Sequence, residues 1–314
     1  MTGGMTGLGP QLPRNWYLLG PARRFAPGTV TTHAIASREL VVWRGRDGGA
    51  PVVMDAHCAH MGCHLGKAAV LGQSLRCPLH YRMIGADGGF VGHAGTLRQA
   101  RYPAREFLGG LFVFLGDPDE AWDLGALVLD GNASCHAGEH RFALPWQWLV
   151  ANGLDIEHLS SVHDRRLLEP PTMTRDGNAM LRIDYRTLPM ASGLSDRIMA
   201  RLAGNGVRGT IRSLAGSMML VEAEVGRRRT FILLSFLPQP GEMTLIRGIV
   251  GVKGRPGLAN RLSARVAKLL FKAFLRKDLG VLDGMEWHEP AHAHSPGDGF
   301  TQAACAFFRD LPGA

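Results

Sequence analysis

The sequence is poor in cysteine and has no long apolar run. Its 314 residues include only five cysteines, an odd number that is spread along the chain and does not make a disulfide framework. No apolar run has the length of a membrane span, and none at the start has the form of a cleavable leader. We therefore expect a globular chain in the reducing cytoplasm, where cysteines are more often ligands or core residues than bridges.

Several binding motifs are also absent. No zinc-finger spacing, RNP motif or helix-turn-helix pattern accompanies the excess of 35 Lys+Arg over 27 Asp+Glu, a net charge of +8, so we expect no nucleic-acid partner. The positive charge instead favours an acidic protein or an anionic membrane surface. The sequence has no Gly-x-Gly-x-x-Gly after a strand, no flavin motif and no P-loop. Electrons from NAD(P)H would therefore have to come through another protein.

The composition and length indicate two globular domains. With 46% hydrophobic and 20% charged residues, the chain can bury a core, and its length is about twice the usual ~150 residues per domain. Residues 1–14 are expected to form a mobile tail, residues 15–140 a first domain with its connector, and residues 141–314 a second domain. Short β-rich runs in the first domain predict strands at Trp16–Leu19, Glu39–Trp43, Pro51–Met54 and Gly110–Leu115. The segment from Asp119 to Arg141 is turn-rich and connects the domains.

The second domain mixes helices and strands. Apolar spacing predicts a helix over Trp146–Leu168, ended by Pro170-Pro171. Strands are expected at Ser217–Ala223, Thr230–Leu237 and Thr244–Val250. A second helix, Leu258–Leu275, is amphipathic: one face carries Leu262, Val266, Leu269, Leu270 and Phe274, with Arg261, Arg265, Lys268, Lys272 and Arg276 elsewhere. It is either a surface helix with a solvated basic face or a docking element for an acidic partner or membrane surface.

Two short segments each offer one cysteine and one histidine at ligand spacing. They are Cys58-x-His60 and Cys77-x-x-His80, with sixteen residues between them. Thiolate and imidazole together suit zinc or an iron–sulfur centre. A Cys/His zinc finger usually pairs like with like, whereas mixed pairs fit a Rieske [2Fe-2S] cluster, in which two histidines replace two cysteines on one iron. Structural zinc, or four unrelated residues, are the alternatives.

Cys63 follows the first pair in the order Cys-x-His-x-Gly-Cys. In the Rieske proteins of quinol-oxidising complexes, a cysteine in the second segment forms a disulfide to this position. Here Leu79 stands where that cysteine would be. We therefore expect Cys63 to be unbridged and to pack as a small residue. Those electron-transfer subunits also carry a membrane anchor, which makes them the second choice for this chain.

Asp155, His158 and His163 form a second candidate group, within the helix expected at Trp146–Leu168. Asp155 and His158 share a helical face. On a regular helix His158 and His163 are separated by ~500°, which leaves them roughly 140° apart. They can therefore bind one ion only if the helix is distorted or ends between them. Two histidines with a distant carboxylate form the facial triad of non-haem Fe(II) oxygenases.

Taken together, the two groups resemble the oxygenase (alpha) component of the Rieske non-haem iron oxygenases, and the compact chain is most similar to the sterol and ketosteroid-type monooxygenases. The resemblance covers nearly the whole chain. It implies an α+β fold: an N-terminal all-β Rieske [2Fe-2S] domain, then a catalytic domain with a curved antiparallel sheet wrapped on helices, in a helix-grip-like arrangement. It also implies a ring-shaped homotrimer.

The resemblance also implies a role for each candidate residue. Cys58 and Cys77 would hold one cluster iron, and His60 and His80 the other. His158 and His163 match the histidines that bind the mononuclear Fe(II). Asp155 matches the carboxylate that links this iron to the Rieske histidine of the neighbouring subunit. The third iron ligand matches Asp278 best; Asp283 is its competitor, and Asp278 alternatively caps a helix. His288, His292 and His294 match no ligand position and are expected to be exposed.

Two departures from the family pattern affect the surroundings of the cluster. His80 is followed by Tyr81-Arg82, where the family usually has Gly-Trp, and Ala59 stands where the first segment usually has proline. The resemblance implies that O2 and electrons from a separate flavin reductase or ferredoxin are used to hydroxylate, demethylate or desaturate a small hydrophobic ring compound, sterol-like or aromatic. Met218-Met219-Leu220 and Phe231-Ile232-Leu233-Leu234 are candidate pocket segments. The alternative function is electron transfer without oxygenase activity.

Overall fold

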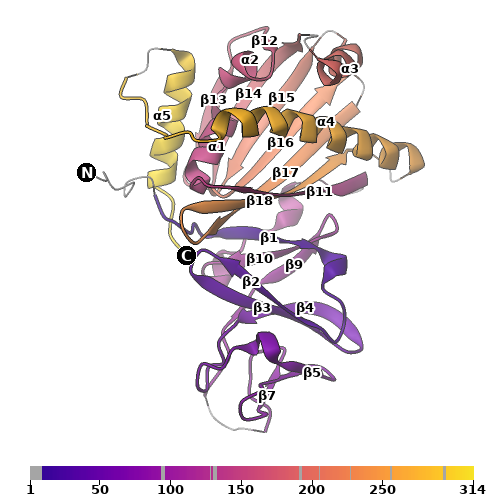
Figure 1. The fold of residues 1–314 in the computed structure, drawn as a ribbon, viewed down its shortest axis with the longest axis vertical. Helices are drawn as coiled ribbons and strands as arrows, with labels where there is room; N and C mark the ends of the chain where they lie inside the picture. Colours follow the sequence, from indigo (N-terminus) through magenta and orange to yellow (C-terminus); the bar gives the residue numbers. More distant parts are fainter. Residues whose placement is uncertain are drawn as a thin grey trace.

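The computed structural model describes residues 9–92, 96–127, 129, 133–190, 193–204, 206–226, 228–254, 257–292 and 295–314. These residues form a strand-rich N-terminal part and a larger C-terminal part built on one sheet, stacked end to end in Figure 1. The sequence-based prediction of an α+β chain with an all-β first half agrees with this architecture. None of the described helices combines the length and the apolar character needed to cross a bilayer.

The N-terminal part contains three antiparallel sheets. Their strands are β1 (Asn15–Pro21), β10 (Gly110–Leu115) and β9 (Ala104–Phe107); β2 (Val30–Ile35), β3 (Arg38–Gly45), β4 (Gly48–Asp55) and β8 (Arg101–Tyr102); and β5 (Ala69–Leu71), β6 (Ser74–Arg76) and β7 (Met83–Gly85). Each of the strands expected here from the sequence is present. The two Cys/His segments follow β4 and β6, at the end of the molecule where Figure 1 shows β5 and β7.

The C-terminal part is built on a long antiparallel sheet. In spatial order its strands are β11 (Ala133–Phe142), β18 (Met243–Val252), β17 (Arg228–Gln239), β16 (Met218–Val225), β15 (Val207–Leu214), β14 (Met180–Pro189) and β12 (Arg165–Leu167), with β13 (Thr172–Asp176) also paired to β14. The segment before Arg141 is less turn-rich than expected, because β11 pairs with β18 from Ala133 onward. The large sheet thus begins ahead of the predicted domain boundary at residue 140.

Five α-helices are seen in the described residues: α1 (Trp146–Leu154), α2 (His158–Ser161), α3 (Leu194–Ala203), α4 (Leu258–Leu282) and α5 (Pro296–Arg309). The prediction of one helix over Trp146–Leu168 is wrong. Asp155 is extended, with φ −72° and ψ 107°, and its carboxylate accepts a hydrogen bond from the Glu157 N–H. Such a local side-chain bond competes with the helical bond and ends α1.

The helix α4 is longer than expected and lies across one face of the large sheet (Figure 1). It packs against β11 and β18 and extends to Leu282 rather than Leu275. Asp278 is therefore inside the helix and buried, so the interpretation of Asp278 as a helix cap is wrong.

The two faces of the large sheet pack against different partners, because side chains alternate along a strand. Met218 and Leu220 pack with Trp16 and Phe112 of the N-terminal part, in a core that joins the two parts. Met219 faces the opposite way, into the core that contains α1, α4 and α5. The helical side of the sheet is the one that holds the second group of candidate residues.

Residues 9–14 lie against the C-terminal part. The Trp146 indole donates to the carbonyl of Gln11 at 3.1 Å, and the backbone N–H of Arg14 donates to the carbonyl of Pro312 at 3.1 Å. Of the predicted mobile tail, residues 1–8 lie outside the described residues. Residues 11–14 are held by these backbone contacts, which a glycine-rich composition does not predict.

Candidate active site

The two Cys/His segments come together at the tip of the N-terminal part. The thiols of Cys58 and Cys77 are buried and within hydrogen-bonding contact of each other. The rings of His60 and His80 lie 5.0 Å apart between centroids, and His80 is exposed. Two buried thiols and two outer imidazoles match the donor set of a Rieske cluster, with two cysteines on one iron and two histidines on the other.

A buried glutamine holds the first segment. Gln99 accepts a hydrogen bond from the Ala59 N–H at 2.8 Å and donates to the carbonyls of Asp55 and His57, both at 2.9 Å. The Cys58 N–H donates to the carbonyl of Cys63, which closes the loop on itself. Sequence reasoning missed Gln99, because its contacts are to backbone atoms and no motif marks it.

The second segment turns sharply after His80. Tyr81 has φ +54°, in the left-handed region that favours glycine. This is the position at which the family usually has glycine, so the departure seen in the sequence puts a side chain on a strained turn. The Arg76 guanidinium lies over the exposed Tyr81 ring at 5.1 Å, and the Cys77 N–H bonds the carbonyl of Arg82 across the turn.

The five cysteines are free. Cys63 is half-buried, and its thiol contacts that of Cys77. Burial and the neighbouring thiol raise the pKa of the Cys63 side chain. Cys305 is fully buried, which raises its pKa to about 12, and Cys135 is half-buried. Neither Cys135 nor Cys305 adjoins the two candidate groups.

The second group converges from three elements. His158 begins α2, His163 lies just before β12, and Asp278 is in the last third of α4. Nε2 of His163 lies 2.7 Å from Oδ1 of Asp278, and Nε2 of His158 lies 3.8 Å from the same oxygen. The three ligand atoms are within 4.8 Å of one another. The end of α1 at Asp155 makes this convergence possible, as the spacing of the two histidines requires.

The tautomer of His158 suits a metal ligand. Its Nδ1 contacts the backbone carbonyl of Asp155, which can only accept, so Nδ1 carries the proton. The lone pair of Nε2 is then free to face Asp278. A ligating histidine usually donates its other N–H to such a carbonyl. Asp155 thus contacts His158 through its backbone, while its half-buried carboxylate accepts from the Glu157 N–H.

His163 is enclosed by apolar surface. The Phe274 ring stacks on its imidazole, with centroids 3.3 Å apart and planes at 6°. Burial lowers the pKa of His163 despite the opposing effect of Asp278, which favours the neutral imidazole that binds metals. Among the described residues, its Nδ1 is buried without a hydrogen-bond partner. Two imidazoles and one carboxylate in a buried site fit a non-haem iron with open coordination positions.

The competing candidates lie elsewhere. Asp283 follows the end of α4 and is exposed, so the structure brings Asp278 to the histidines and not Asp283. His288 and His292 are exposed in the loop before α5. His294 lies outside the described residues.

An apolar cavity of about 480 Å³ adjoins His158, His163 and Asp278. Its size is in the range of small-molecule sites, ~300–1,000 Å³. Of the two candidate pocket segments, only alternate residues line it: Met219 from β16, and Ile232 and Leu234 from β17. Met218, Leu220, Phe231 and Leu233 face the other side of the sheet.

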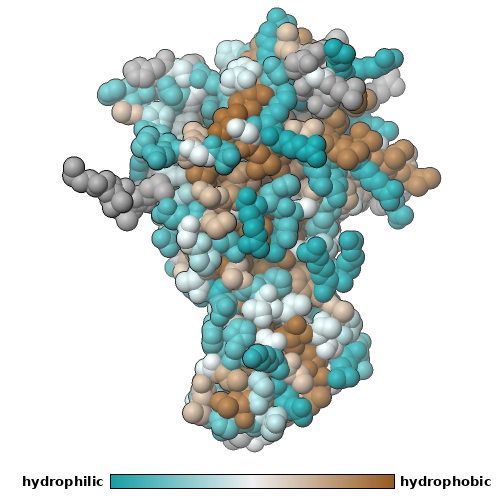
Figure 2. Space-filling view, viewed as in Figure 1, coloured by the Kyte–Doolittle hydropathy of each residue, from teal (hydrophilic) through white to brown (hydrophobic). Residues whose placement is uncertain are grey.

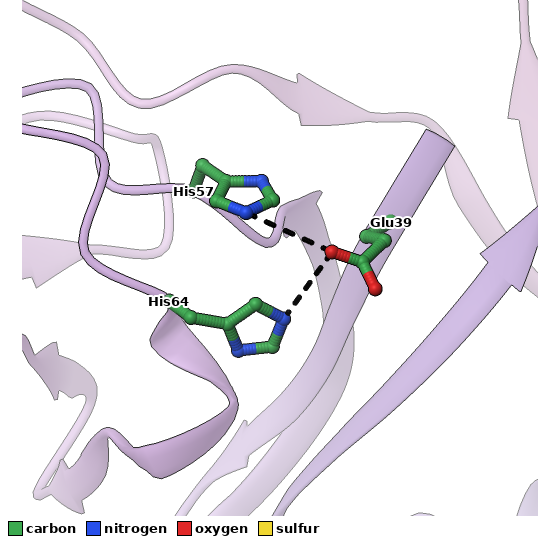
Figure 3. Close-up of side chains that lie close together, drawn as sticks. All are labelled: Glu39, His57 and His64. Atoms are coloured by element: carbon green, nitrogen blue, oxygen red, sulfur yellow. Dashed lines mark ion pairs between the residues drawn. The ribbon is translucent and has the colours of Figure 1, made fainter. Parts of the chain in front are cut away.

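A third group, Glu39, His57 and His64, lies at the base of the first loop (Figure 3). The Nε2 atoms of both histidines are 3.7 Å from Oε2 of Glu39. However, Nδ1 of His64 accepts a hydrogen bond from the Gly66 N–H at 3.0 Å, so the proton of the neutral ring is on Nε2. In contrast to His158, this tautomer points an N–H at the carboxylate. The group is therefore a polar cluster at the surface, with His64 half-buried, that links the two ends of the loop through Glu39.

Comparison with known proteins finds a Rieske [2Fe-2S] domain in this chain and a similarity to Rieske-type oxygenases. The Rieske [2Fe-2S] domain model matches residues 15–103. The oxygenase component of 3-ketosteroid-9-alpha-monooxygenase from Mycolicibacterium smegmatis is 39% identical over 167 residues, which are 48% of this chain and 43% of that protein. Cholesterol 7-desaturase nvd 1 from Ciona intestinalis is 27% identical over 173 residues, 50% of this chain and 36% of that protein. The matches thus span less than half the length of these relatives.

Among solved structures, dicamba monooxygenase with non-heme iron and dicamba has the same fold. The TM-score is 0.65 at 17% identity, and the match covers 95% of this chain and 96% of that chain. The predicted fold class, a Rieske domain followed by a domain with a large sheet and helices, is confirmed. The predicted resemblance to the Rieske oxygenases is confirmed as well, since residues 15–103 are a Rieske domain and the relatives are named monooxygenases and desaturases.

Proposed function

We propose that this Rieske-domain protein is the oxygenase component of a Rieske non-haem iron oxygenase system. The observation that carries the proposal is the convergence of His158, His163 and Asp278 at the wall of an apolar cavity, in a chain that also has a Rieske domain. A protein that only transfers electrons needs no such second site. The reaction is hydroxylation, demethylation or desaturation of a hydrophobic ring compound, by monooxygenation or dioxygenation.

Seven residues would hold the two metal groups: Cys58, His60, Cys77 and His80 for the cluster, and His158, His163 and Asp278 for the iron. When bound, the cluster supplies single electrons and the iron activates O2. The carbonyl of Asp155 keeps the proton of His158 on Nδ1, away from the metal side. Phe274 covers the His163 ring and excludes water from it.

The cavity favours a hydrophobic substrate. Met219, Ile232 and Leu234 offer apolar contacts next to the histidine pair, and Phe236 and Ile246 extend this surface. Burying apolar substrate surface against such residues contributes about 25 cal/mol per Å². Because these contacts have no direction, the orientation of the substrate depends on shape and on the few polar residues, such as Asn152 and Thr187. Sterol-like and aromatic rings are the substrate classes that this surface suits.

A homotrimer would bring the two metal sites of neighbouring chains together. The cluster segments lie at the tip of the N-terminal part, whereas α2 and β12 lie at the opposite end of the molecule (Figure 1). Electrons would therefore pass from His80 of one subunit to the Asp155 region of the next. The half-buried Asp155 carboxylate supports this role, since it keeps one oxygen beyond the bond from Glu157.

The electron donor would be a ferredoxin or a flavin reductase that takes electrons from NAD(P)H. The net charge of +8 favours an acidic donor. Around the exposed His80, the side chains of Met61, Leu79 and Tyr81 offer apolar surface for docking. The five free cysteines support a cytoplasmic location.

Anaerobic purification tests the proposal. We expect about three irons and two sulfides per chain, a visible and EPR spectrum of a reducible [2Fe-2S] cluster, and oxygenated or desaturated product when the reduced protein meets O2 and a panel of hydrophobic rings. His158→Ala is the control: it should keep the cluster spectrum and lose product formation. A colourless zinc protein, or a His158→Ala variant with full function, contradicts the proposal.

A further inference from the structure

The cavity opens at one end of α4. Four residues line it and are also exposed to solvent: Leu202 of α3, Arg228 of β17, and Leu262 and Val266 of α4. Residues of this kind mark the mouth of a cavity. Asp278, at the inner end, follows Leu262 by sixteen residues on the same helix, which is about 24 Å along the axis. The candidate iron ligands are thus deep, and the mouth is at the outer end of α4.

Large apolar side chains are exposed around this mouth. On α4, Leu258 is 85%, Leu262 61% and Leu269 68% exposed, and on α3 Ile198 and Leu202 are exposed as well. Figure 2 shows hydrophobic residues at the outer end of α4 with hydrophilic ones beside them. An apolar patch of this kind marks an interaction surface rather than ordinary solvent-facing surface. We call these five residues, with the basic residues described next, the rim.

The rim is strongly positive. No aspartate or glutamate occurs between Leu258 and Lys277, and the same stretch carries Arg261, Arg265, Lys268, Lys272 and Arg276. On α3, Arg197 and Arg201 alternate with the exposed Ile198 and Leu202. Basic residues beside exposed leucines on a helix that lies along the surface are typical of proteins that bind an anionic bilayer in its plane.

Two other binding partners for the rim are a second copy of this chain and the acidic electron donor, and neither fits it. A second copy of this chain would bring two positive rims together, and like charges repel across such a contact. An acidic electron donor has to approach the segment between β6 and β7 that contains His80, and Figure 1 shows β7 at the opposite end of the molecule from α4. A lipid surface matches both the charge and the apolar residues of the rim.

We propose that the rim docks on the surface of an anionic membrane and that the cavity takes its substrate from the lipid. The first half of this proposal is independent of catalysis; the second rests on the proposed function and narrows its substrate to a lipophilic ring compound that partitions into bilayers. A compound of that kind is scarce in water, so a mouth at the lipid surface shortens its path to His158 and Asp278.

Vesicle co-sedimentation of the full chain tests the docking. We expect binding to phosphatidylcholine vesicles that contain phosphatidylglycerol, little binding to phosphatidylcholine alone, and release at high salt. Leu258→Gln/Leu269→Gln should weaken binding more than about tenfold, because both leucines then lose their burial in lipid. Neither leucine lines the cavity, so the cluster spectrum and the melting temperature should stay unchanged. Leu71→Gln, at an exposed leucine of β5, is the matched control.

Charge is tested with a second matched pair. Arg265→Gln on α4 should weaken binding about fivefold, and Arg101→Gln on β8 should not change it. Equal binding to neutral and anionic vesicles, or wild-type binding by the double leucine variant, overturns the proposal. So does a change in the oligomeric mass of that variant, which would make the rim a contact between copies. Because these measurements use no substrate and no O2, their outcome does not depend on whether the proposed oxygenase function is correct.

Discussion

Oδ1 of Asp278 lies 2.7 Å from Nε2 of His163, although 115 residues separate them in the sequence. The contact joins α4 to the segment between α2 and β12, and with His158 it completes a buried group of two imidazoles and one carboxylate. The same contact favours Asp278 over Asp283 as the third ligand, because Asp283 lies one residue past the end of α4 and is exposed.

Iron content is expected to distinguish Asp278 from Asp283. Asp278→Ala should lower the iron count from about three to about two per chain and leave the cluster spectrum unchanged, since it removes one of three mononuclear ligands. Asp283→Ala should keep about three irons. Iron and sulfide analysis of anaerobically purified protein measures both variants, and loss of iron in Asp283→Ala alone would reverse the assignment.

The four candidate cluster residues could be identified from the sequence because their pattern is local. Cys58-x-His60 and Cys77-x-x-His80 are close pairs whose spacing reflects one chemistry. The contact of Asp278 with His163 is not local, and the sequence, although it favoured Asp278, left Asp283 as a competitor. The two aspartates differ in their place relative to α4, which extends to Leu282: Asp278 lies inside the helix and Asp283 lies after its end.

Two other predictions, the long helix and the pocket segments, were wrong or incomplete because apolar spacing did not carry the needed information. Apolar spacing continued through Asp155, but the bond from the Glu157 N–H to its carboxylate ended α1. The runs around Met219 and Ile232 are apolar on both faces of the sheet, because one face packs on the N-terminal part. Hydrophobicity alone therefore did not show which half of each run faces the cavity.

The turn after His80 gives a prediction about backbone strain. Tyr81 has φ +54°, a conformation that costs a residue with a side chain about 1 kcal/mol relative to glycine. Tyr81→Gly should therefore be about 1 kcal/mol more stable than Tyr81→Ala, the reverse of the usual order, since both variants lose the contact with Arg76 equally. Urea unfolding of the cluster-loaded variants measures the difference. A more stable alanine variant would mean that this turn is not strained.

Acid is expected to destabilise the protein through His33. Burial, with a smaller contribution from the Arg247 charge, lowers the pKa of His33 to about 4, against about 6.5 in the unfolded chain. The unfolded state therefore binds the proton more readily. Above pH ~6.5 the imidazole is neutral in both states, and the free energy of unfolding has its full value. As the pH falls toward 4, protonation of the unfolded chain lowers this free energy by about 1–2 kcal/mol, after allowance for the partial exposure of His33. Between pH 7 and pH 4.5, the urea midpoint of wild type should therefore fall further than that of His33→Gln. A constant difference would contradict this.

Because the two candidate metal sites lie far apart in one chain, we expect two inactive variants to restore activity when they are co-expressed. If electrons pass between neighbouring subunits of a ring, each active site needs iron ligands from one chain and cluster ligands from the next. His80→Ala and Asp278→Ala chains should each be inactive alone. Co-expressed in equal amounts, they should give about one quarter of the wild-type rate per chain, because half of the chains keep their iron site and half of their neighbours keep a cluster.

A second mixture separates this from transfer within one subunit. Wild type co-expressed with the double variant His80→Ala/Asp278→Ala should also give about one quarter of the wild-type rate if transfer crosses subunits, but about one half if it stays within one chain. Transfer within one chain also predicts no activity for the first mixture. Asp155→Asn added to the chain that keeps its iron site should abolish the recovered rate while the iron count stays the same, because it removes the carboxylate proposed to link the two sites.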